Sequence, residues 1–280
     1  MRAADILGVD EVTFIEPGFA ALTDCTFTAG LAMIRADEGR LLLDEREDPV
    51  GMAFHGQDGW IAGSFLFRNP SVPCIELFES VNGEIFQEDR AVWAGAVREY
   101  FSTALAKDVP PSIDDLNPMR HRILKSLIGS VWGDGHGDTC IDCCCGSGVG
   151  SAVLRDLGFS PLSYDNDESL LSRGLTEKRL LPDETMWIDA TIASRYIEPG
   201  PRGVAIMAGE FNSFNQEMWE RIISELCSIA HDVLITVGTE KETVLVREWG
   251  SAMERSVVVS ENPADPLYDR WVCRVLTIQS

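Results

Sequence analysis

Residues 138–167 read DTCIDCCCGSGVGSAVLRDLGFSPLSYDND, and this stretch decides the fold of the chain. The apolar run Thr139–Cys145 has the length and composition of a buried strand. Glycines at 146, 148 and 150 follow it, and then a helical stripe of apolar residues ends at Gly158. A second strand-length run, Pro161–Tyr164, comes next. This order predicts a strand, a glycine turn, a helix and a parallel strand, which is the repeating unit of an α/β domain.

The same alternation continues toward the C-terminus. Strand-length runs lie at Thr185–Ile188, Val204–Ala208 and Val233–Val237, and amphipathic helical stripes separate them. Two further runs, 257–259 and 271–278, have only turn residues between them, so they should pair as an antiparallel hairpin. We therefore predict an α/β fold with a Rossmann-like, seven-stranded, mostly parallel sheet that ends in an antiparallel hairpin.

The first 110 residues have a different pattern. Short apolar runs separated by Gly, Pro and Asp predict a mostly β meander over residues 11–80. The runs are Val12–Ile15, Cys25–Ile34, Arg40–Leu43, Trp60–Phe67 and Cys74–Phe78. A long helix should follow over 84–106, and two adjacent prolines at 110 and 111 indicate a boundary. We expect a β-rich (α+β) cap over 1–110 that helps to select a substrate, and a second domain over 111–280. The apolar stripe of the long helix would dock on that domain or form a homodimer.

Composition narrows the possible partners. The chain has a formal net charge of −22 and a sequence pI near 4.4. Such a charge repels phosphate backbones and attracts cations, so we expect no nucleic-acid partner. The first residues lack the apolar core of a signal peptide, and no apolar run approaches the roughly 20 residues that span a bilayer. We expect an acidic cytoplasmic protein without a membrane partner.

Three acids stand at the ends of the first three predicted strands of the second domain. They are Asp142, Asp165 and Asp189. In doubly wound α/β sheets, ligands bind outside the carboxyl ends of the parallel strands, and these three acids should lie close together there. Asp165 follows Gly146 by 19 residues, which is the spacing of an acid that binds ribose hydroxyls. The pattern predicts a nucleoside site at this edge.

At this point the sequence resembles the class I S-adenosylmethionine-dependent methyltransferases. The segment Ile141–Gly148 is similar to the first motif of that family, an acid followed by a glycine-rich turn. The resemblance implies that Gly146 and Gly148 let the methionine part of the cofactor lie against the loop, and that Asp142 helps to bind its cationic end. Cys144 occupies a position where many members have glycine.

The resemblance also assigns the nucleoside end of the cofactor. It implies that Asp165 binds the ribose hydroxyls and that Asp189 and Ala190 contact the adenine. Cys144, Ser147 and Asn166 complete the expected cofactor-binding set. The implied cofactor is S-adenosyl-L-methionine, and the implied activity is methyl transfer to a small molecule or a protein side chain.

Two other functions fit parts of the pattern. An NAD(P)-dependent oxidoreductase would use the glycines for a pyrophosphate and Asp165 for a ribose. Asp142 argues against it, because its charge would lie near two phosphates, whereas a sulfonium and an ammonium group suit an acidic site. A non-catalytic S-adenosylmethionine-binding protein with a regulatory or scaffold role is the other alternative.

The segment after the fourth strand of the predicted sheet should face the acceptor. In the resembled family this region lies near the transferred methyl group, and here it contains Glu210 and Asn212. Glu210 is our candidate for a base and Asn212 for a contact with the acceptor. Asn212 serves equally well as a cap for the following helix.

Four cysteines crowd into Cys140–Cys145. They have the residue types of a zinc or iron–sulfur site. Neighbouring residues of a strand point to opposite faces, so Cys143 and Cys145 cannot easily share a metal with Cys144. We favour small buried core residues and predict no metal.

Overall fold

The computed structural model describes residues 2–113 and 117–278. The chain divides after Ala104 into two compact units, each with its own sheet. The helix α4, Arg90–Asp108, runs through the point of division. No helix in the two described ranges is both long enough and apolar enough to cross a bilayer.

The N-terminal unit has a five-stranded sheet in the order β1-β4-β3-β2-β5, counted over its described residues. The strands are β1 Thr13–Phe14, β2 Glu38–Leu43, β3 Pro49–Gly56, β4 Gly59–Ser64 and β5 Glu84–Gln87. β2, β3 and β4 form an antiparallel meander, while β1 pairs parallel with β4, and β5 pairs parallel with β2. The helical elements before α4 are α1 Ala3–Ile6, η1 Phe19–Thr23, α2 Thr26–Leu31 and α3 Val72–Ser80. The unit is β-rich, but it is not the simple meander that we predicted.

Two of the predicted strands in this unit are helices. The run Cys25–Ile34 contains α2, which buries Thr28 and Leu31, three residues apart. The run Cys74–Phe78 lies inside α3. The buried residues of this helix are Cys74 and Phe78, which are four residues apart. Spacings of three and four place side chains on one helix face, so the buried pairs follow a helical period inside runs that are short and mostly apolar.

Two further differences concern β3 and β5. The sequence analysis named no strand at Pro49–Gly56, although this strand lies at the centre of the sheet. Residues Ile85 and Phe86, which we assigned to the long helix, belong to β5 at the sheet edge. The helix α4 begins only at Arg90.

The C-terminal unit contains the sheet that the sequence predicted. Its order is β11-β12-β10-β9-β6-β7-β8, seven strands among the described residues. The strands are β6 Thr139–Cys143, β7 Ser160–Asp165, β8 Thr185–Trp187, β9 Gly200–Ala205, β10 Ala230–Val237, β11 Arg255–Glu261 and β12 Trp271–Thr277. β12 is antiparallel to both β10 and β11, and the other neighbours pair in parallel. The predicted fold class is confirmed.

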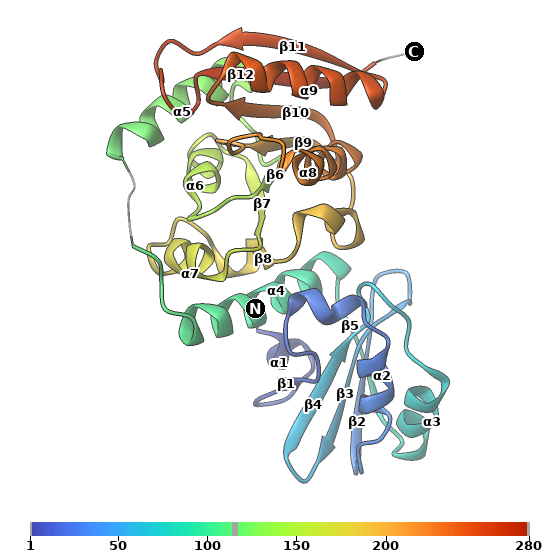
Figure 1. The fold of residues 1–280 in the computed structure, drawn as a ribbon. Helices are drawn as coiled ribbons and strands as arrows, with labels where there is room; N and C mark the ends of the chain where they lie inside the picture. The colour runs from blue at the N-terminus through green and yellow to red at the C-terminus, as the bar shows by residue number, and fades with distance from the viewer. Residues whose placement is uncertain (1, 114–116, 279–280) are drawn as a thin grey trace. The chain divides into compact units, whose positions relative to one another are not determined.

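Helices cover both faces of this sheet. Figure 1 shows α6 and α7 on one face and α8 on the other. The helical elements are α5 Pro118–Trp132, α6 Val149–Asp156, α7 Glu168–Thr176, η2 Pro182–Glu184, η3 Ala190–Arg195, α8 Gln216–Ile229 and α9 Glu240–Ala252. α5 packs against α6, and α9 packs against β11 and β12. The core that α5 and α6 form with the sheet contains Leu124 and Ile128 of α5 and Val153 and Leu154 of α6, all fully buried.

The fourth strand of this unit ends earlier than predicted. β9 stops at Ala205, and Met207 has a left-handed φ of 55°, which no strand accommodates. α8 starts at Gln216, so Phe214 is not part of its apolar stripe and is 98% exposed. The segment 206–215 is therefore a loop at the carboxyl end of the sheet.

Candidate functional site

The turn between β6 and α6 is built from left-handed residues. Cys144 and Gly146 both have φ of 53°, and Gly148, the residue before α6, has φ of 82°. This conformation costs a residue with a side chain about 1–2 kcal/mol, so the turn favours glycine. Cys144 adopts it without being glycine, at the position where the resembled family often has one. The strained turn reverses the chain at the carboxyl end of the central strand.

The two glycines of the turn have different surroundings. A Cβ added at Gly146 would meet only the Leu170 side chain, at 3.9 Å, among the described atoms. A Cβ added at Gly148 would lie 2.6 Å from Leu180 Cγ, which is a steric clash. Gly146 thus leaves room for a ligand to approach the backbone, whereas the missing side chain of Gly148 makes room for Leu180. The expected contact between Gly148 and a ligand stays a prediction.

Asp165, the last residue of β7, holds the turn in place. Its Oδ2 atom accepts a hydrogen bond from the backbone N–H of Gly146 at 2.8 Å, and its Oδ1 atom accepts one from Asp167 N–H at 2.9 Å. The residue is 7% exposed. Burial raises the pKa of its carboxyl, while the N–H donors of Asp167 and Gly146 oppose that rise. The structure therefore brings together the acid and the glycine that the 19-residue spacing associated.

Asp142 lies beneath the turn rather than on its open side. Its Oδ2 atom accepts a hydrogen bond from the Ser151 hydroxyl at 2.6 Å, and that hydroxyl is 2.8 Å from the Ser163 hydroxyl. Burial raises the pKa of Asp142 to about 7. With 1% exposure, the carboxyl supports the start of α6, and its expected contact with the cationic end of a cofactor stays a prediction.

The third acid and its neighbours lie at the next strand. Asp189 Oδ1 accepts hydrogen bonds from the Thr191 N–H and hydroxyl, both at 2.8 Å, so Asp189 caps η3. The N–H of Ile188 donates to the backbone oxygen of Asp165 at 3.2 Å, which joins the ends of β7 and β8. Ala190 is buried.

Asn166 is exposed beside these residues. Its backbone oxygen accepts a hydrogen bond from the Trp187 indole at 3.1 Å. Ser147 is half-buried, and its backbone oxygen accepts a hydrogen bond from Arg179 Nε at 2.8 Å. The ends of β6, β7 and β8 thus meet at one edge, with exposed polar groups beside the open backbone of Gly146.

The loop after β9 contains the two candidate catalytic residues. Glu210 is exposed, and its backbone oxygen accepts a hydrogen bond from Asn215 Nδ2 at 2.9 Å. The side chain of Asn212 accepts a hydrogen bond from Phe214 N–H at 2.9 Å, so it shapes the loop. Asn215, and not Asn212, is the residue before the first turn of α8. The carboxylate of Glu210 is open to solvent at the carboxyl end of β9.

The cysteines of β6 and its turn are divided between the core and the turn. Cys140 and Cys143 are fully buried, and the Sγ atoms of Cys143 and Cys144 are 3.8 Å apart. Burial raises the pKa of the Cys140 and Cys145 thiols, so both stay protonated at neutral pH. Within residues 2–113 and 117–278, no group of three or more His, Cys, Asp or Glu side chains could hold a metal ion.

The structure adds a polar chain that the sequence analysis missed. Arg120 Nε of α5 donates to Asp269 Oδ2 at 3.2 Å, and Thr236 Oγ1 donates to Asp269 Oδ1 at 2.5 Å. Thr236 Oγ1 in turn accepts a hydrogen bond from Met207 N–H at 2.7 Å. Arg120 and Asp269 are 149 residues apart, and no local pattern connects them. These hydrogen bonds connect α5 and the hairpin loop to the segment that contains Glu210.

Comparisons with known proteins give only distant similarity. No model of a known protein family matches the chain, and no curated protein matches it. Magnesium protoporphyrin IX methyltransferase from Synechocystis PCC 6803, solved with SAM bound, is 14% identical, with a TM-score of 0.45 over 66% of this chain and 97% of that one. A putative RNA methyltransferase from Pyrococcus horikoshii is 10% identical, with a TM-score of 0.46 over 65% of this chain and 98% of that one. Precorrin-6y C5,15-methyltransferase from Geobacter metallireducens GS-15 is 11% identical, with a TM-score of 0.43 over 62% and 96%. Similarities of this size assign neither a reaction nor an acceptor to this chain.

Gly148→Ala tests the packing of the turn, with Gly137→Ala as the matched control. Both glycines have a left-handed φ, 82° and 85°, but no described atom lies within 4 Å of a Cβ added at Gly137. We expect Gly137→Ala to lower the free energy of unfolding by about 1–2 kcal/mol. Gly148→Ala should cost roughly 1–3 kcal/mol more, because its Cβ overlaps Leu180. Urea unfolding measures both, and equal losses would contradict this role of Gly148.

Asp142→Asn tests the buried carboxyl through its pH dependence. The pKa of Asp142 is raised from 3.8 to about 7, so the folded carboxyl keeps a proton that the unfolded one loses near pH 4. The free energy of unfolding contributed by this group therefore falls as the pH rises from about 4 to about 7. Asp142→Asn lacks this fall, so its free energy of unfolding relative to the wild type should increase by up to roughly 4 kcal/mol as the pH rises across that range.

Urea unfolding at constant ionic strength follows this difference. The exposed Asp134→Asn is the control, because it makes the same substitution at the surface. A difference between Asp142→Asn and the wild type that stays constant with pH would show that the pKa of Asp142 is the same in the folded and unfolded protein, and would contradict the raised value.

Proposed function

We propose that this chain is a class I S-adenosylmethionine-dependent methyltransferase. The observation that carries the proposal is the hydrogen bond between Gly146 N–H and Asp165, which holds a buried acid beside an open stretch of backbone. That arrangement lies at the carboxyl ends of neighbouring parallel strands, where wound sheets bind ligands. A nucleoside needs both features, an acceptor for its ribose hydroxyls and a backbone that its remaining atoms can approach.

The sheet order favours this function over an oxidoreductase. Dinucleotide-binding sheets of the common type have six parallel strands in the order 3-2-1-4-5-6. Here the antiparallel β12 lies between β10 and β11, which agrees with the C-terminal hairpin of the resembled family. The buried Asp142 and Asp165, with a net charge of −22, suit a cationic ligand better than a pyrophosphate.

The residues present fit the cofactor at its ribose. Each carboxylate oxygen of Asp165 accepts one N–H donor and can accept a second, so the acid retains capacity for two hydroxyl groups. Asn166, Asp189 and Ala190 would border the adenine, on the β7 and β8 side of the acid. Ser147 would border the turn at its methionine side.

The turn itself would accommodate the methionine end of the cofactor. Gly146 would lie against it, with Cys144 beside it, and Gly148 keeps its predicted contact as part of this proposal. Asp142 would act from beneath by holding the start of α6 and by adding negative charge when it is ionised. In this proposal Asp142 positions the turn and helps to bind the cationic end of the cofactor.

Methyl transfer asks little covalent chemistry of the protein. The cofactor would supply a methyl group on a sulfonium, which is already a strong electrophile. In our proposal the acceptor's lone pair bonds to the methyl carbon as the carbon–sulfur bond breaks, and the acceptor's proton leaves to Glu210 or to water. The chain would contribute chiefly orientation, because alignment of the two reactants supplies most of the rate enhancement. Asn212 would shape the loop that presents Glu210.

The acceptor is, in our proposal, a small molecule or a protein side chain. The distant structural neighbours include a magnesium protoporphyrin IX methyltransferase and a putative RNA methyltransferase. The charge of −22 disfavours a nucleic acid here. Selection of the acceptor by the N-terminal unit and formation of a homodimer stay predictions.

Asp165→Asn tests the proposal, with Asp167→Asn as its control. Both variants remove one negative charge from the same segment, and asparagine caps a helix as well as the aspartate at 167 does. We expect isothermal titration with S-adenosylmethionine to show binding by the wild type and a loss of roughly 10–100-fold in Asp165→Asn, because two charge-assisted hydrogen bonds disappear. Asp167→Asn should bind within about threefold of the wild type.

Two results would contradict the proposal. One is a wild type that does not bind the cofactor, and the other is equal affinity in the two variants. Thermal unfolding without ligand shows whether each variant is folded. Binding without methyl transfer to any component of a cell extract would favour the non-catalytic alternative.

A further inference from the structure

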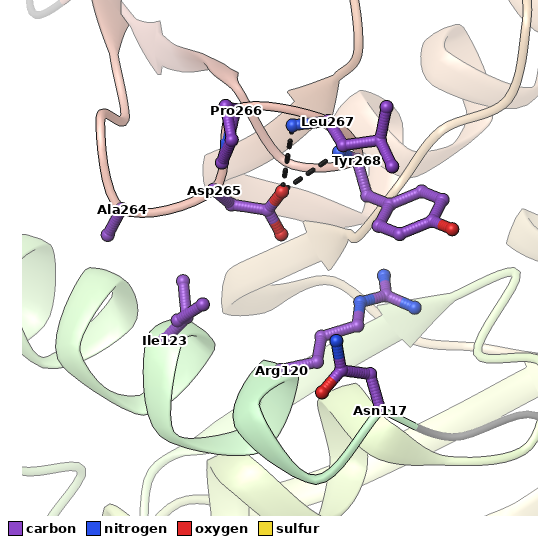
Figure 2. A pocket seen from close by; sticks show the side chains of 8 residues that line it. All are labelled: Asn117, Arg120, Ile123, Ala264, Asp265, Pro266, Leu267 and Tyr268. Carbon is purple, nitrogen blue, oxygen red and sulfur yellow. Dashed lines mark hydrogen bonds between the residues drawn. The ribbon is translucent and has the colours of Figure 1, made fainter.

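A cavity of about 190 Å³ lies between the start of α5 and the loop that joins β11 to β12 (Figure 2). Its walls come from two segments far apart in the sequence. The lining residues are Asn117, Arg120, Ile123, Ala264, Asp265, Pro266, Leu267 and Tyr268. All of them belong to the C-terminal unit.

The cavity has a cationic group on one wall. Arg120 uses its Nε atom for Asp269, and its Nη1 and Nη2 amines have no hydrogen-bond partner among the described residues. Asn117 accepts Met119 N–H through its Oδ1 atom, and Figure 2 shows its amide nitrogen on the cavity side. These N–H groups, beside the N-terminus of a 15-residue helix, form a site for a carboxylate.

The opposite wall has an anionic group. Asp265 is 6% exposed, and its Oδ1 atom accepts hydrogen bonds from Leu267 N–H and Tyr268 N–H at 3.0 and 2.9 Å. Its Oδ2 atom has no donor among the described residues. Figure 2 shows this oxygen directed across the cavity toward Arg120. An ammonium group in the cavity would pair with this oxygen through a charge-assisted hydrogen bond.

The remaining lining is apolar and the volume is small. Ile123, Ala264, Pro266 and Leu267 contribute aliphatic surface between the two charged groups. Pockets for drug-sized ligands usually measure about 300–1,000 Å³, so 190 Å³ fits a smaller molecule. A carboxylate site, an ammonium site and an aliphatic wall together match a small zwitterion with an apolar side chain, such as an α-amino acid.

The cavity is tied to the edge of the sheet where transfer would occur. Arg120 in the cavity wall is hydrogen-bonded to Asp269, Asp269 to Thr236, and Thr236 to the backbone of Met207. Met207 lies after β9, in the loop that also contains Glu210. The hairpin loop itself adjoins the end of β10, because Trp271 pairs with Val237. The cavity is thus held beside the ends of β9 and β10, on the other side of β9 from the Asp165 edge.

We infer that this cavity binds the methyl acceptor, and that the acceptor is a small zwitterion with an apolar side chain. The role of the bound molecule as a methyl acceptor rests on the proposed function. Arg120 and Asn117 bind its carboxylate, and Asp265 binds its ammonium group. The recognition does not require a nucleic acid or a protein partner.

The experiment uses free L-leucine and L-phenylalanine as probes, with S-adenosylhomocysteine present at saturation. N-acetyl-L-leucine lacks the ammonium group, and L-leucine methyl ester lacks the carboxylate. Isothermal titration on the full chain should show that at least one free amino acid binds and that both blocked leucines bind at least tenfold more weakly than leucine.

Two variants assign the binding to the cavity. Asp265→Asn keeps an oxygen that accepts the Leu267 and Tyr268 N–H groups but replaces Oδ2 with an NH₂ group. It should therefore lower the affinity for the free amino acid at least tenfold. It should leave the already weak binding of the N-acetyl form unchanged. Arg120→Lys should lower the affinity for leucine and leave the affinity for leucine methyl ester unchanged. Glu248→Gln, an exposed residue of α9, is the control with the same change of charge as Asp265→Asn.

The inference is overturned if neither free amino acid binds while S-adenosylhomocysteine does, or if the blocked forms bind as well as leucine. It is also overturned if Asp265→Asn or Arg120→Lys weakens S-adenosylhomocysteine as much as leucine, because the cavity would then hold the methionine end of the cofactor. Failure of the wild type to bind S-adenosylhomocysteine contradicts the proposed function, and the acceptor role falls with it. Leucine titrated alone then still decides whether the cavity takes zwitterions.

Discussion

The hydrogen bond from Gly146 N–H to Asp165 Oδ2 is the contact on which the candidate site depends. It fastens the left-handed turn after β6 to the end of the neighbouring strand β7. The backbone oxygen of Asp165 also accepts the N–H of Ile188, so the third strand end is held by the same residue. Without the carboxylate, the turn would lose its hydrogen bond to the end of β7, while the backbone bond to Ile188 would remain.

Two buried carboxyl groups give this edge its electrostatic character. Burial raises the pKa of both Asp142 and Asp165, and the charge of Asp165 adds to the rise at Asp142. A cation beside them would favour their ionised forms, whereas an anionic ligand would oppose them. The second candidate site differs, because Arg120 and Asp265 offer one charge of each sign. In our proposals the two sites would therefore select ligands of different charge.

The sequence predicted the parts of the fold that local pattern determines. The strand–turn–helix unit around Gly146 and the antiparallel hairpin follow from period and spacing, and both are present. The runs Cys25–Ile34 and Cys74–Phe78 are short and mostly apolar, so their pattern did not distinguish helix from strand. The first contains α2, and the second lies within α3. Contacts between distant segments, such as Arg120 with Asp269, leave no local signal. The burial of Asp142 was equally invisible, because a strand-end acid can face a ligand or a helix.

A fold of this kind hosts many reactions, so the assignment depends on the site and not on the sheet. The most direct measurement is a crystal structure of the chain grown with S-adenosylhomocysteine. The account predicts the nucleoside over the turn after β6, with its ribose hydroxyls within hydrogen-bond distance of Asp165 and its amino-acid end against Gly146. A ligand bound elsewhere on the chain, or a turn that stays empty at saturating ligand, would contradict it.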